Sequence, residues 1–267
     1  PRYSDRLVNV WLWDDWPGRW GPDCGIDLVA EDRDGKNWAI QAKCYDPKYS
    51  VTKNDVDKFL SESTNENIGH RLLIATTDHL GNNARSVIHR GDKVIPVSQV
   101  LLAGLETAPV VWPSDPARLR GGGPCKPVKR WPHQTQAINN VTTNLGKRGQ
   151  MISACGTGKT LAALWISERL EAKRTLVLLP SLTLLSQTVS EWLANTKEPF
   201  AYLPVCSDDT VSRGNDAAVL FTSDLEYPVT TNPDDIATFL RRHGRQVVFS
   251  TYQSSHQIAE AQTHSRV

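Results

Sequence analysis

The chain has 267 residues, which is long enough for two domains of ordinary size. Its 30 basic and 29 acidic residues give a net charge of +1, so no basic tail is present and any contact with nucleic acid must come from a local patch. No apolar run approaches the roughly eighteen residues of a membrane span, and the start lacks the order of a signal peptide, which together predict a cytoplasmic protein without a membrane partner.

The first half of the chain is predicted to be a small α/β domain. We expect an N-terminal helix, a hairpin over residues 25–46, a helix over 53–63, a strand over 71–77, a helix near 82–90 and a strand over 93–97. Thr52 is expected to cap the helix over 53–63, and Asp55 lies in its first turn, where a carboxylate meets the positive end of the helix.

A stretch rich in Pro, Gly and basic residues interrupts the pattern and predicts a linker over residues 114–130, which divides a domain over 1–113 from one over 131–267. After the linker we expect a helix over 133–145, a strand over 150–154, a helix from Lys159, a strand over 175–180, a helix from Ser181 and a strand over 246–250. Strands that alternate with helices predict a parallel, doubly wound sheet. The five cysteines are scattered and form no Cys-x-x-Cys pair, so we expect reduced thiols and no zinc site.

The segment SACGTGKT, residues 153–160, follows a predicted strand and opens a predicted helix, which is the setting of a phosphate-binding loop. The two glycines allow backbone N–H groups to turn towards phosphate oxygens, the lysine reaches the β and γ oxygens, and the second threonine can ligate Mg²⁺. A glycine-rich turn that binds nothing is the weaker alternative. The predicted nucleotide-contacting residues are Gly156, Thr157, Gly158, Lys159 and Thr160, with Thr160 also a metal ligand.

The hairpin over residues 25–46 carries polar side chains that a half-apolar hairpin does not need. Gln41 and Lys43 point to the same face, because strand residues two apart do so, and antiparallel pairing brings Asp27 beside Gln41. Metal-dependent hydrolysis of a phosphodiester requires an oxygen-rich cradle for Mg²⁺ and a nearby cation. Asp27, Gln41 and the carbonyl of Ala42 offer the oxygens and Lys43 the cation; a solvated face with an Asp–Lys pair is the alternative.

At these residues the sequence resembles the PD-(D/E)xK nucleases, and specifically the Mrr-like branch, in which G-x-D is followed by Q-x-K; the matching residues are 25–27 and 41–43. The resemblance covers most of residues 3–105. It implies that Asp27 and Gln41 are metal ligands and that Lys43 is the catalytic lysine.

Because Gln41 stands where the usual motif has an acid, the implied site is one negative charge short. Asp23 is the first candidate for a further carboxylate, although a role in a turn is equally open. Asp5, Asp14 and Asp15 on the predicted first helix are weaker candidates.

The second half resembles the superfamily 2 helicases and nucleases of the restriction type. These share a small residue other than Gly at the first position of the phosphate loop, here Ser153. On spacing alone, the segment WPHQTQAI contains ordinary polar helix residues; by the resemblance, Gln134 reads adenine. Two later segments, LVLLPSLTLLSQTVSEW and VVFSTYQSS, look like further helicase motifs, which contain Pro180, Ser181, Gln187, Ser250 and Thr251.

The order of these motifs resembles the N-terminal part of type ISP restriction–modification enzymes. The resemblance implies a Mg²⁺-dependent, type II-like, site-specific DNA endonuclease coupled to an ATP-dependent translocase on double-stranded DNA. Its cofactors are Mg²⁺ and ATP, and S-adenosylmethionine serves only a downstream methyltransferase domain. The Asp-Glu box expected after residue 255 is not in the sequence, so we expect a truncated motor lobe that is continued by motor, methyltransferase and target-recognition domains.

Two other functions remain open at this stage: a repair or defence helicase with an accessory nuclease, and a nuclease fold that has lost its chemistry and only docks on DNA. The tryptophans near the N-terminus are expected to pack in the core rather than stack on bases; they are Trp11, Trp13, Trp16 and Trp20. The basic residues Lys48, Lys53, Arg71, Arg85 and Arg90 could follow DNA, but an ordinary solvated charge is the favoured interpretation of each.

Overall fold

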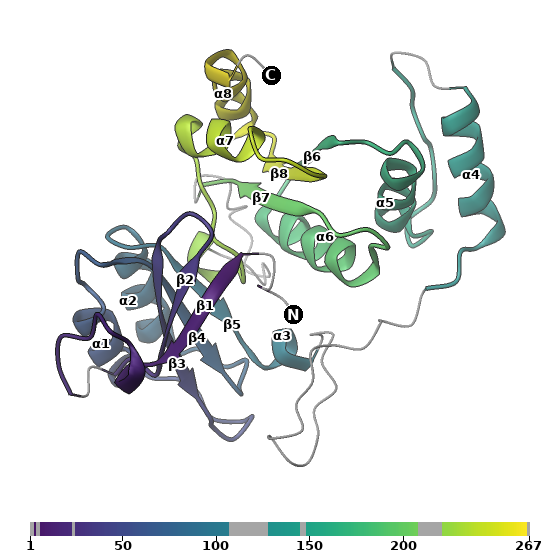
Figure 1. The fold of residues 1–267 in the computed structure, drawn as a ribbon. Coiled ribbons are helices and arrows are strands. Elements are labelled where there is room, and N and C mark those ends of the chain that lie inside the picture. Colours follow the sequence, from purple (N-terminus) through teal and green to yellow (C-terminus); the bar gives the residue numbers. More distant parts are fainter. Residues whose placement is uncertain are drawn as a thin grey trace. The chain divides into compact units, whose positions relative to one another are not determined.

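The computed structural model describes residue 3 and residues 6–22, 25–106, 128–144, 148–207 and 221–265 (Figure 1). These residues form two compact units. Unit 1 contains the described residues up to 106 together with residues 221–229, and unit 2 contains the described residues from 128 to 207 and from 230 onwards. Within this part of the chain, no helix is both long enough and apolar enough to span a membrane.

Unit 1 is built on a five-stranded sheet in the order β1-β2-β3-β4-β5. The antiparallel strands are β1 (Leu7–Leu12), β2 (Leu28–Asp32) and β3 (Asn37–Lys43), whereas β4 (Ile68–Ala75) and β5 (Val97–Val100) run parallel to β3. The parallel strands are joined by α1 (Lys53–Glu62) and α2 (Asn82–Asp92), and α3 (Leu102–Glu106) follows β5. Parallel neighbours need such crossover connections, so this half of the sheet is an α/β unit.

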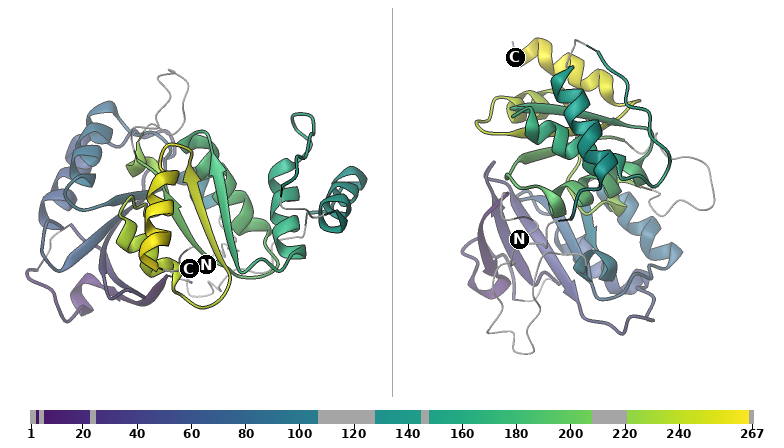
Figure 2. Two further views of the ribbon diagram at one scale, coloured as in Figure 1. Left: turned by 90° about the horizontal axis from the view of Figure 1, so that it is seen from above. Right: turned by 90° about the vertical axis from the view of Figure 1, so that its right-hand side faces the viewer.

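Helices α1 and α2 cover one face of this sheet (Figures 1 and 2). Their buried residues, including Val56, Phe59 and Ile88, pack against Val29 and Leu73 of the strands. The opposite face carries a second cluster, which is centred on Trp38, Ile40, Leu72 and Val100. The sheet is therefore buried on both faces around β3 and β4, and these two strands form the centre of the unit.

The predicted N-terminal helix is wrong. Residues 7–12 form β1, and a single 3₁₀ turn, η1 (Trp13–Asp15), follows it. The stretch contains Val8, Val10 and Leu12, and its backbone pairs with β2, for example Val10 with Ala30. Branched apolar residues favour a pleated strand once a neighbour supplies the hydrogen bonds, and β2 is that neighbour.

The predicted strand over 93–97 is displaced, because β5 starts at Val97. The residues before it turn back on the end of α2, where the N–H groups of Val94 and Ile95 donate to the carbonyl of Gly91. Pro96 has no N–H and cannot donate to a sheet ladder. Strand pairing with β4 therefore begins only after the proline.

Unit 2 contains a parallel three-stranded sheet in the order β6-β8-β7, with β6 (Arg174–Leu179), β7 (Ala201–Val205) and β8 (Gln246–Thr251). Helix α6 (Leu182–Asn195) covers one face, and its Trp192 contacts Phe249 with the ring centroids 5.4 Å apart. Helices α7 (Pro233–Leu240) and α8 (Ser255–Ser265) pack on the other face against Val248. The doubly wound arrangement is thus confirmed. Helices α4 (Pro132–Thr143) and α5 (Lys159–Arg169) precede the sheet.

The strand predicted over residues 150–154 does not form in the described structure, and the side chain of Ile152 is 87% exposed. An extended segment becomes a strand only when a neighbour completes its hydrogen bonds. The adjacent candidate, β6, is paired with β8 alone and is an edge of the described sheet. Leu176 and Leu178 of β6 are exposed accordingly, with 47% and 39% of their surface accessible.

The aromatic residues near the N-terminus and three of the cysteines can be placed. Trp13 and Trp16 are buried, and Trp11 and Trp20 are partly buried against the same core, so the packing interpretation of this group is confirmed. Among the described cysteines, Cys44 and Cys155 are exposed and Cys206 is buried, and none of the three is in a disulfide.

Candidate functional site

The hairpin of β2 and β3 brings Asp27 next to Gln41. Leu28 pairs with Ile40, so the same register continued by one residue sets Asp27 opposite Gln41. The backbone N–H of Asp27 donates to the carbonyl of Ile40 at 2.9 Å, and its Oδ2 accepts a 2.7 Å hydrogen bond from the N–H of Ala42. The carboxylate is exposed and fixed by the backbone of the strand beside it.

Gln41 is only 2% exposed, which is unusual for an amide side chain. Its Nε2 donates to the carbonyl of Gly25 at 2.8 Å, whereas its Oε1 is buried and has no hydrogen-bond partner among the described residues. Gly25 has a φ of 63°, a left-handed conformation that glycine adopts without strain. A buried amide oxygen without a partner lowers the stability of the fold by about 1–3 kcal/mol. A ligand that binds this oxygen would recover part of that free energy.

Lys43 ends β3 and is half-buried, and within the described structure its ammonium group has no hydrogen-bond or ion-pair partner. The backbone around it is held by Thr76. The N–H of Thr76 donates to the carbonyl of Lys43 at 3.0 Å, and the hydroxyl of Thr76 accepts from the N–H of Tyr45 at 2.7 Å. The position of the lysine is therefore set by the end of β4, while its charge remains available.

Behind Lys43, two tyrosines bind the carboxylate at the start of α1. The hydroxyls of Tyr45 and Tyr49 each donate to Asp55 at 3.0 Å, and the N–H of Thr52 donates to it at 2.7 Å. Burial raises the pKa of Tyr45 to about 12, and the hydrogen bond to Asp55 adds to this effect. Burial also acts to raise the pKa of Asp55, but the hydrogen bonds from Thr52 and the tyrosines outweigh it and lower that pKa.

Thr52 is the N-cap of α1, as expected, and Asp55 lies in the first turn of that helix. The N–H and the hydroxyl of Thr52 both donate to Asp55, at 2.7 and 2.8 Å. The two tyrosines were not anticipated from the sequence, although their position directly after the Q-x-K motif is the signal that could have identified them.

The three oxygen groups described at this site fit Mg²⁺. Asp27 contributes one carboxylate, Gln41 a buried amide oxygen without a partner and Ala42 a backbone carbonyl. Mg²⁺ commonly binds one or two carboxylates and keeps several waters. No cluster of three His, Cys, Asp or Glu residues occurs in the described ranges. Asp5 and Asp23 lie outside those ranges, and Asp14 and Asp15 are exposed in η1, where Asp14 forms a 2.9 Å ion pair with Arg19.

The phosphate loop ends at Gly158, the N-cap of α5, which has a φ of 71°. Gly156 has a φ of 76°, so both glycines occupy the left-handed region. The ammonium of Lys159 lies over the loop, 2.7 Å from the carbonyl of Ala154 and 3.3 Å from that of Ser153. Thr160 follows in the first turn, and its carbonyl accepts from the indole of Trp192 at 3.0 Å. The free N–H groups of a helix start favour a phosphate at this position.

Gln134 lies against this loop. Its Nε2 is 3.2 Å from the carbonyl of Thr157 and 3.4 Å from that of Gly158, and its Oε1 accepts from the N–H of Trp131 at 2.8 Å. His133 reaches the same Thr157 carbonyl at 3.1 Å. The structure thus joins α4 to the phosphate loop through the residue that the sequence singled out.

Two further helicase-like segments contain the carboxyl ends of β6 and β8, which lie at one edge of the sheet. Ser181 caps α6 by accepting from the N–H of Leu184 at 3.3 Å, and Gln187 bonds to Glu191 on the same helix. Ser250 and Thr251 end β8 and are fully buried. Parallel strands present their carboxyl ends at one edge, where open α/β sheets bind ligands.

Two of the basic residues considered for DNA contact have structural roles. Arg71 is 1% exposed and donates to the carbonyl of Leu60 at 2.9 Å and to the hydroxyl of Ser63 at 2.7 Å, so its assignment to the surface is wrong. Arg85 lies 3.6 Å from the carboxylate of Asp224.

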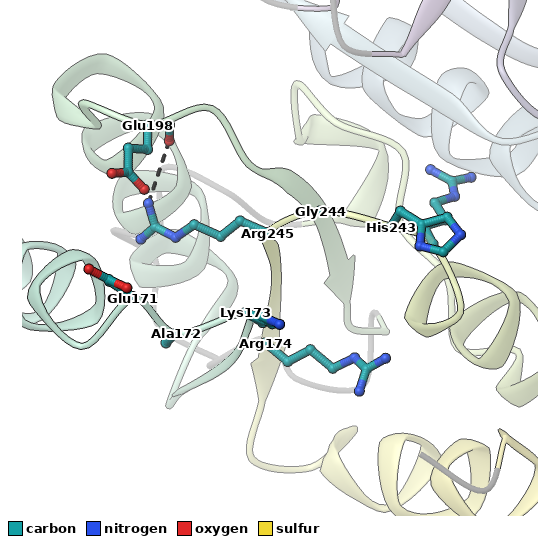
Figure 3. Close-up of a pocket in the computed structure, with 9 residues that line it drawn as sticks. Glu171, Ala172, Lys173, Arg174, Glu198, His243, Gly244 and Arg245 are labelled. Carbon is teal, nitrogen blue, oxygen red and sulfur yellow. Dashed lines mark hydrogen bonds between the residues drawn. The ribbon is translucent and has the colours of Figure 1, made fainter.

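A cavity of about 730 Å³ lies at the opposite end of unit 2 (Figure 3). It is found beyond the carboxyl end of α5, whose 11 residues separate it from the phosphate loop by roughly 16 Å. Arg245, which lines it, is held internally by Ser167 at 2.8 Å and by the carbonyl of Glu198 at 3.5 Å. The other lining residues are Glu171, Ala172, Lys173, Arg174, Glu198, Arg242, His243 and Gly244. This cavity is therefore separate from the nucleotide-type site.

Each half of the chain matches a known protein family. Residues 1–118 match the family described as restriction endonuclease, and residues 128–266 match the family described as type III restriction enzyme, res subunit. No curated protein matches the chain.

Among solved structures, the chain is similar to the ATP-dependent type ISP restriction–modification enzyme LlaBIII bound to DNA. The two are 32% identical with a TM-score of 0.77, over 99% of this chain and 17% of that one. A nuclease-deletion mutant of the type ISP enzyme LlaGI, in complex with a DNA substrate mimic, is 33% identical over 51% of this chain and 14% of that one, with a TM-score of 0.40.

The chain thus spans about a sixth of the length of LlaBIII. Its α/β architecture comprises a restriction-endonuclease-like domain followed by a helicase lobe. The chain belongs, by residues 128–266, to the family of the type III restriction enzyme res subunit, carries a restriction endonuclease domain in residues 1–118, and is similar in structure to a part of the type ISP restriction–modification enzyme LlaBIII.

Proposed function

We propose that the chain is the Mg²⁺-dependent, type II-like DNA endonuclease domain of a restriction enzyme, joined to the first part of an ATP-dependent translocase on double-stranded DNA. The observation that carries the proposal is the buried Oε1 of Gln41, which has no partner in the described structure and lies beside the exposed carboxylate of Asp27. Most buried side-chain polar atoms have a hydrogen-bond partner, so an unpaired acceptor beside an exposed carboxylate supports a ligand site. Here the donor end is satisfied and the acceptor end is left for a ligand.

Each residue of the hairpin has a distinct chemical task in this proposal. Asp27, Gln41 and the carbonyl of Ala42 hold the metal, with Asp23 as a further candidate ligand. The chemistry that Mg²⁺ would supply there is activation of a bound water and neutralisation of charge on the scissile phosphate. Lys43 places its ammonium next to that phosphate and stabilises the negative charge that develops there. Thr76 keeps the lysine backbone in register with β4.

The lobe in unit 2 is proposed to bind ATP at its phosphate loop. The N–H groups from Gly156 to Gly158 surround the phosphates, and Lys159 exchanges its loop carbonyls for the β and γ oxygens. Thr160 contributes to the Mg²⁺ site, and Gln134 reads adenine while it fixes the loop. Productive hydrolysis is proposed to require the motor, methyltransferase and target-recognition domains of a longer polypeptide, in which S-adenosylmethionine serves the methyltransferase. The cytoplasm is the proposed location.

The test is cleavage of supercoiled plasmid by the 267-residue chain with Mg²⁺ or Mn²⁺, and by the full-length polypeptide with ATP added. The Lys43→Ala variant removes the cation, whereas Lys36→Ala removes an exposed lysine from the turn between β2 and β3 and serves as the matched control. We expect nicking that EDTA abolishes, that Lys43→Ala reduces by about a hundredfold or more, and that Lys36→Ala leaves intact.

Cleavage that is equal in all three proteins would contradict the assignment of the hairpin. DNA binding without cleavage in any full-length form would favour the docking module instead. A repair or defence helicase would be indicated if the longer polypeptide carried no adenine methyltransferase motif.

A further inference from the structure

The boundary between the two matched families is not the boundary between the two structural units. Residues 221–229 fall within the stretch that matches the res subunit, yet they belong to unit 1 with the nuclease-type domain. They include a single 3₁₀ turn, η4 (Thr222–Asp224). We call residues 221–227 the inserted segment.

The inserted segment binds the edge strand of the nuclease sheet. Gln99 of β5 donates its backbone N–H to the carbonyl of Leu225 at 3.1 Å and its side-chain amide to the carbonyl of Ser223 at 2.5 Å. Gln99 is 2% exposed. Because β5 is the last strand in the order, its outer backbone groups would otherwise be an open edge. The segment closes that edge.

The same segment is bound to α2 through its side chains. The ring of Phe221 stacks on that of His89, with the centroids 3.9 Å apart. The carboxylate of Asp224 lies 3.6 Å from Nε of Arg85, and the hydroxyl of Thr222 donates to Asp92 at 3.2 Å. Asp224 is 8% and Arg85 27% exposed, so this ion pair is largely removed from water and less screened than a surface pair.

The burial of the segment is that of a core element. Ser223 and Leu225 have no accessible surface, and Tyr227 has 1%. Connecting loops usually run over a surface and remain exposed. Full burial of an apolar side chain contributes about 1.5–3 kcal/mol, which indicates that the segment contributes to the stability of unit 1.

The chain is attached to the sheet of unit 2 both before and after the inserted segment. Val205, the last residue of β7, forms a parallel bridge with Thr230, and the N–H of Thr230 donates to the carbonyl of Pro204 at 3.2 Å. Val205 also pairs with Ser250 of β8. The chain therefore leaves and re-enters unit 2 at the carboxyl end of β7, next to the helicase-type segment at Ser250 and Thr251.

We propose that the inserted segment is an integral part of the nuclease domain, supplied by the motor-type lobe, and that it forms a second covalent connection between the two beside the linker near residues 114–130. The β5–α2 edge is stable only while the segment is bound. Because the chain leaves unit 2 after Val205, which pairs with Ser250, and returns to it at Thr230, a displacement of the carboxyl end of β8 is transmitted to the nuclease through the segment. This arrangement is independent of whether the nuclease cleaves.

Hydrogen–deuterium exchange of the 267-residue chain tests the proposal without any assay of activity. Leu225→Ala removes the buried side chain, and we expect exchange at β5 and α2 to accelerate about thirtyfold or more, as for a large-to-small change in a core. Exchange at β6 and α6 should not change. Ile236→Ala is the matched control, because Ile236 is equally buried but lies in α7 of unit 2. It should accelerate α7 and α8 and leave β5 and α2 unchanged.

A charge reversal provides a second test that does not depend on a cavity. Arg85→Asp or Asp224→Arg alone should accelerate exchange in α2 by about threefold to tenfold, and the double reversal should restore it. The proposal is overturned if Leu225→Ala alters only β7 and α7, or if neither single reversal changes α2. Because neither readout requires cleavage or ATP hydrolysis, a failure here is distinct from a failure of the proposed function.

Discussion

The side-chain amide of Gln134 occupies the space in which a side chain at position 158 would lie. A Cβ placed on Gly158 would meet Nε2 of Gln134, and the backbone there has a φ of 71°. The left-handed backbone favours glycine at this position, and any side chain here would displace the amide of Gln134. The phosphate loop and α4 are fitted to each other, so a change in either should affect the other.

Gln134→Ala should loosen the phosphate loop. The variant loses the two contacts to loop carbonyls and the hydrogen bond from Trp131, and we expect unit 2 to lose about 1–3 kcal/mol of stability. If the nucleotide proposal holds, ATP affinity falls as well. Gln136→Ala, an exposed position on the same helix, is the control. Thermal unfolding and titration with a fluorescent nucleotide measure the two effects; equal values for both variants would exclude the role of Gln134.

Gln41→Glu should make the thermal stability of unit 1 depend on Mg²⁺. The new carboxylate would be buried and would lose the hydrogen bond that Gln41 donates to Gly25, so we expect a lower melting temperature in EDTA. Mg²⁺ should then raise the melting temperature of the variant by more than that of the wild type. Asn37→Asp, on the same strand but away from the site, should show no such gain. A variant insensitive to Mg²⁺ would argue against a metal at Gln41.

His70 should make unit 1 less stable in acid. Burial lowers its pKa to about 3, with smaller effects from Arg6, Lys36 and Arg71. The unfolded chain binds a proton at this residue below its ordinary pKa of about 6.5, whereas the folded chain does not until the pH nears 3. The stability due to neutral His70 is therefore complete above pH 6.5 and is lost as the pH falls towards 3, by up to about 1.4 kcal/mol per pH unit.

The measurement is urea unfolding of wild type and His70→Gln between pH 7 and pH 4. Glutamine can retain the 3.1 Å contact to Ser98 but does not titrate, so the variant should show a shallower fall in the free energy of unfolding. His79→Gln changes an exposed histidine of the same unit and should keep the wild-type slope. Parallel slopes for all three proteins would contradict the prediction.

Arg71→Met should destabilise unit 1 severely. The guanidinium donates to the carbonyls of Leu60 and Gly91 and to two hydroxyls, and it joins the end of α1 to the turn after α2. Burial lowers the pKa of Arg71 to about 10, so it remains charged at neutral pH. Methionine fills part of the space but leaves these acceptors unpaired, at a cost of about 3 kcal/mol or more. Arg90→Met on the exposed face of α2 should cost less than 0.5 kcal/mol by chemical denaturation.

Local signals in the sequence were sufficient for part of the fold. Three local signals act within a few residues: the pattern of the hairpin over residues 25–46, the motif from Gly156 to Lys159, and Ser181 before an apolar helix. The elements they predict are present. The alternation in residues 7–12 was misjudged because helix and strand differ there only through pairing with β2, and β2 lies about twenty residues further on. The strand predicted over residues 150–154 is wrong for the converse reason: the pattern favours a strand, but no described strand pairs with these residues.

Long-range contacts were beyond the reach of sequence patterns. Gln99 and Ser223 are 124 residues apart, and nothing in either short stretch indicates that they meet. Arg71 looks like a surface charge in a strand of otherwise apolar residues, and only the ends of α1 and α2 explain its burial. In the candidate site, the pairing of Asp27 with Gln41 followed from the hairpin, whereas the unpaired acceptor of Gln41 could be recognised only in three dimensions.

The exposed thiols give each candidate site a reactive group of its own. Cys44 directly follows Lys43, Cys155 lies within the phosphate loop, and Cys206 is shielded in unit 2. A maleimide fluorophore would thus attach beside the nuclease-type hairpin and within the nucleotide-type loop, and Cys44→Ser or Cys155→Ser would direct it to one of them. By the same exposure, alkylating agents and peroxide have access to both places, so preparations of this chain should be kept under a reductant.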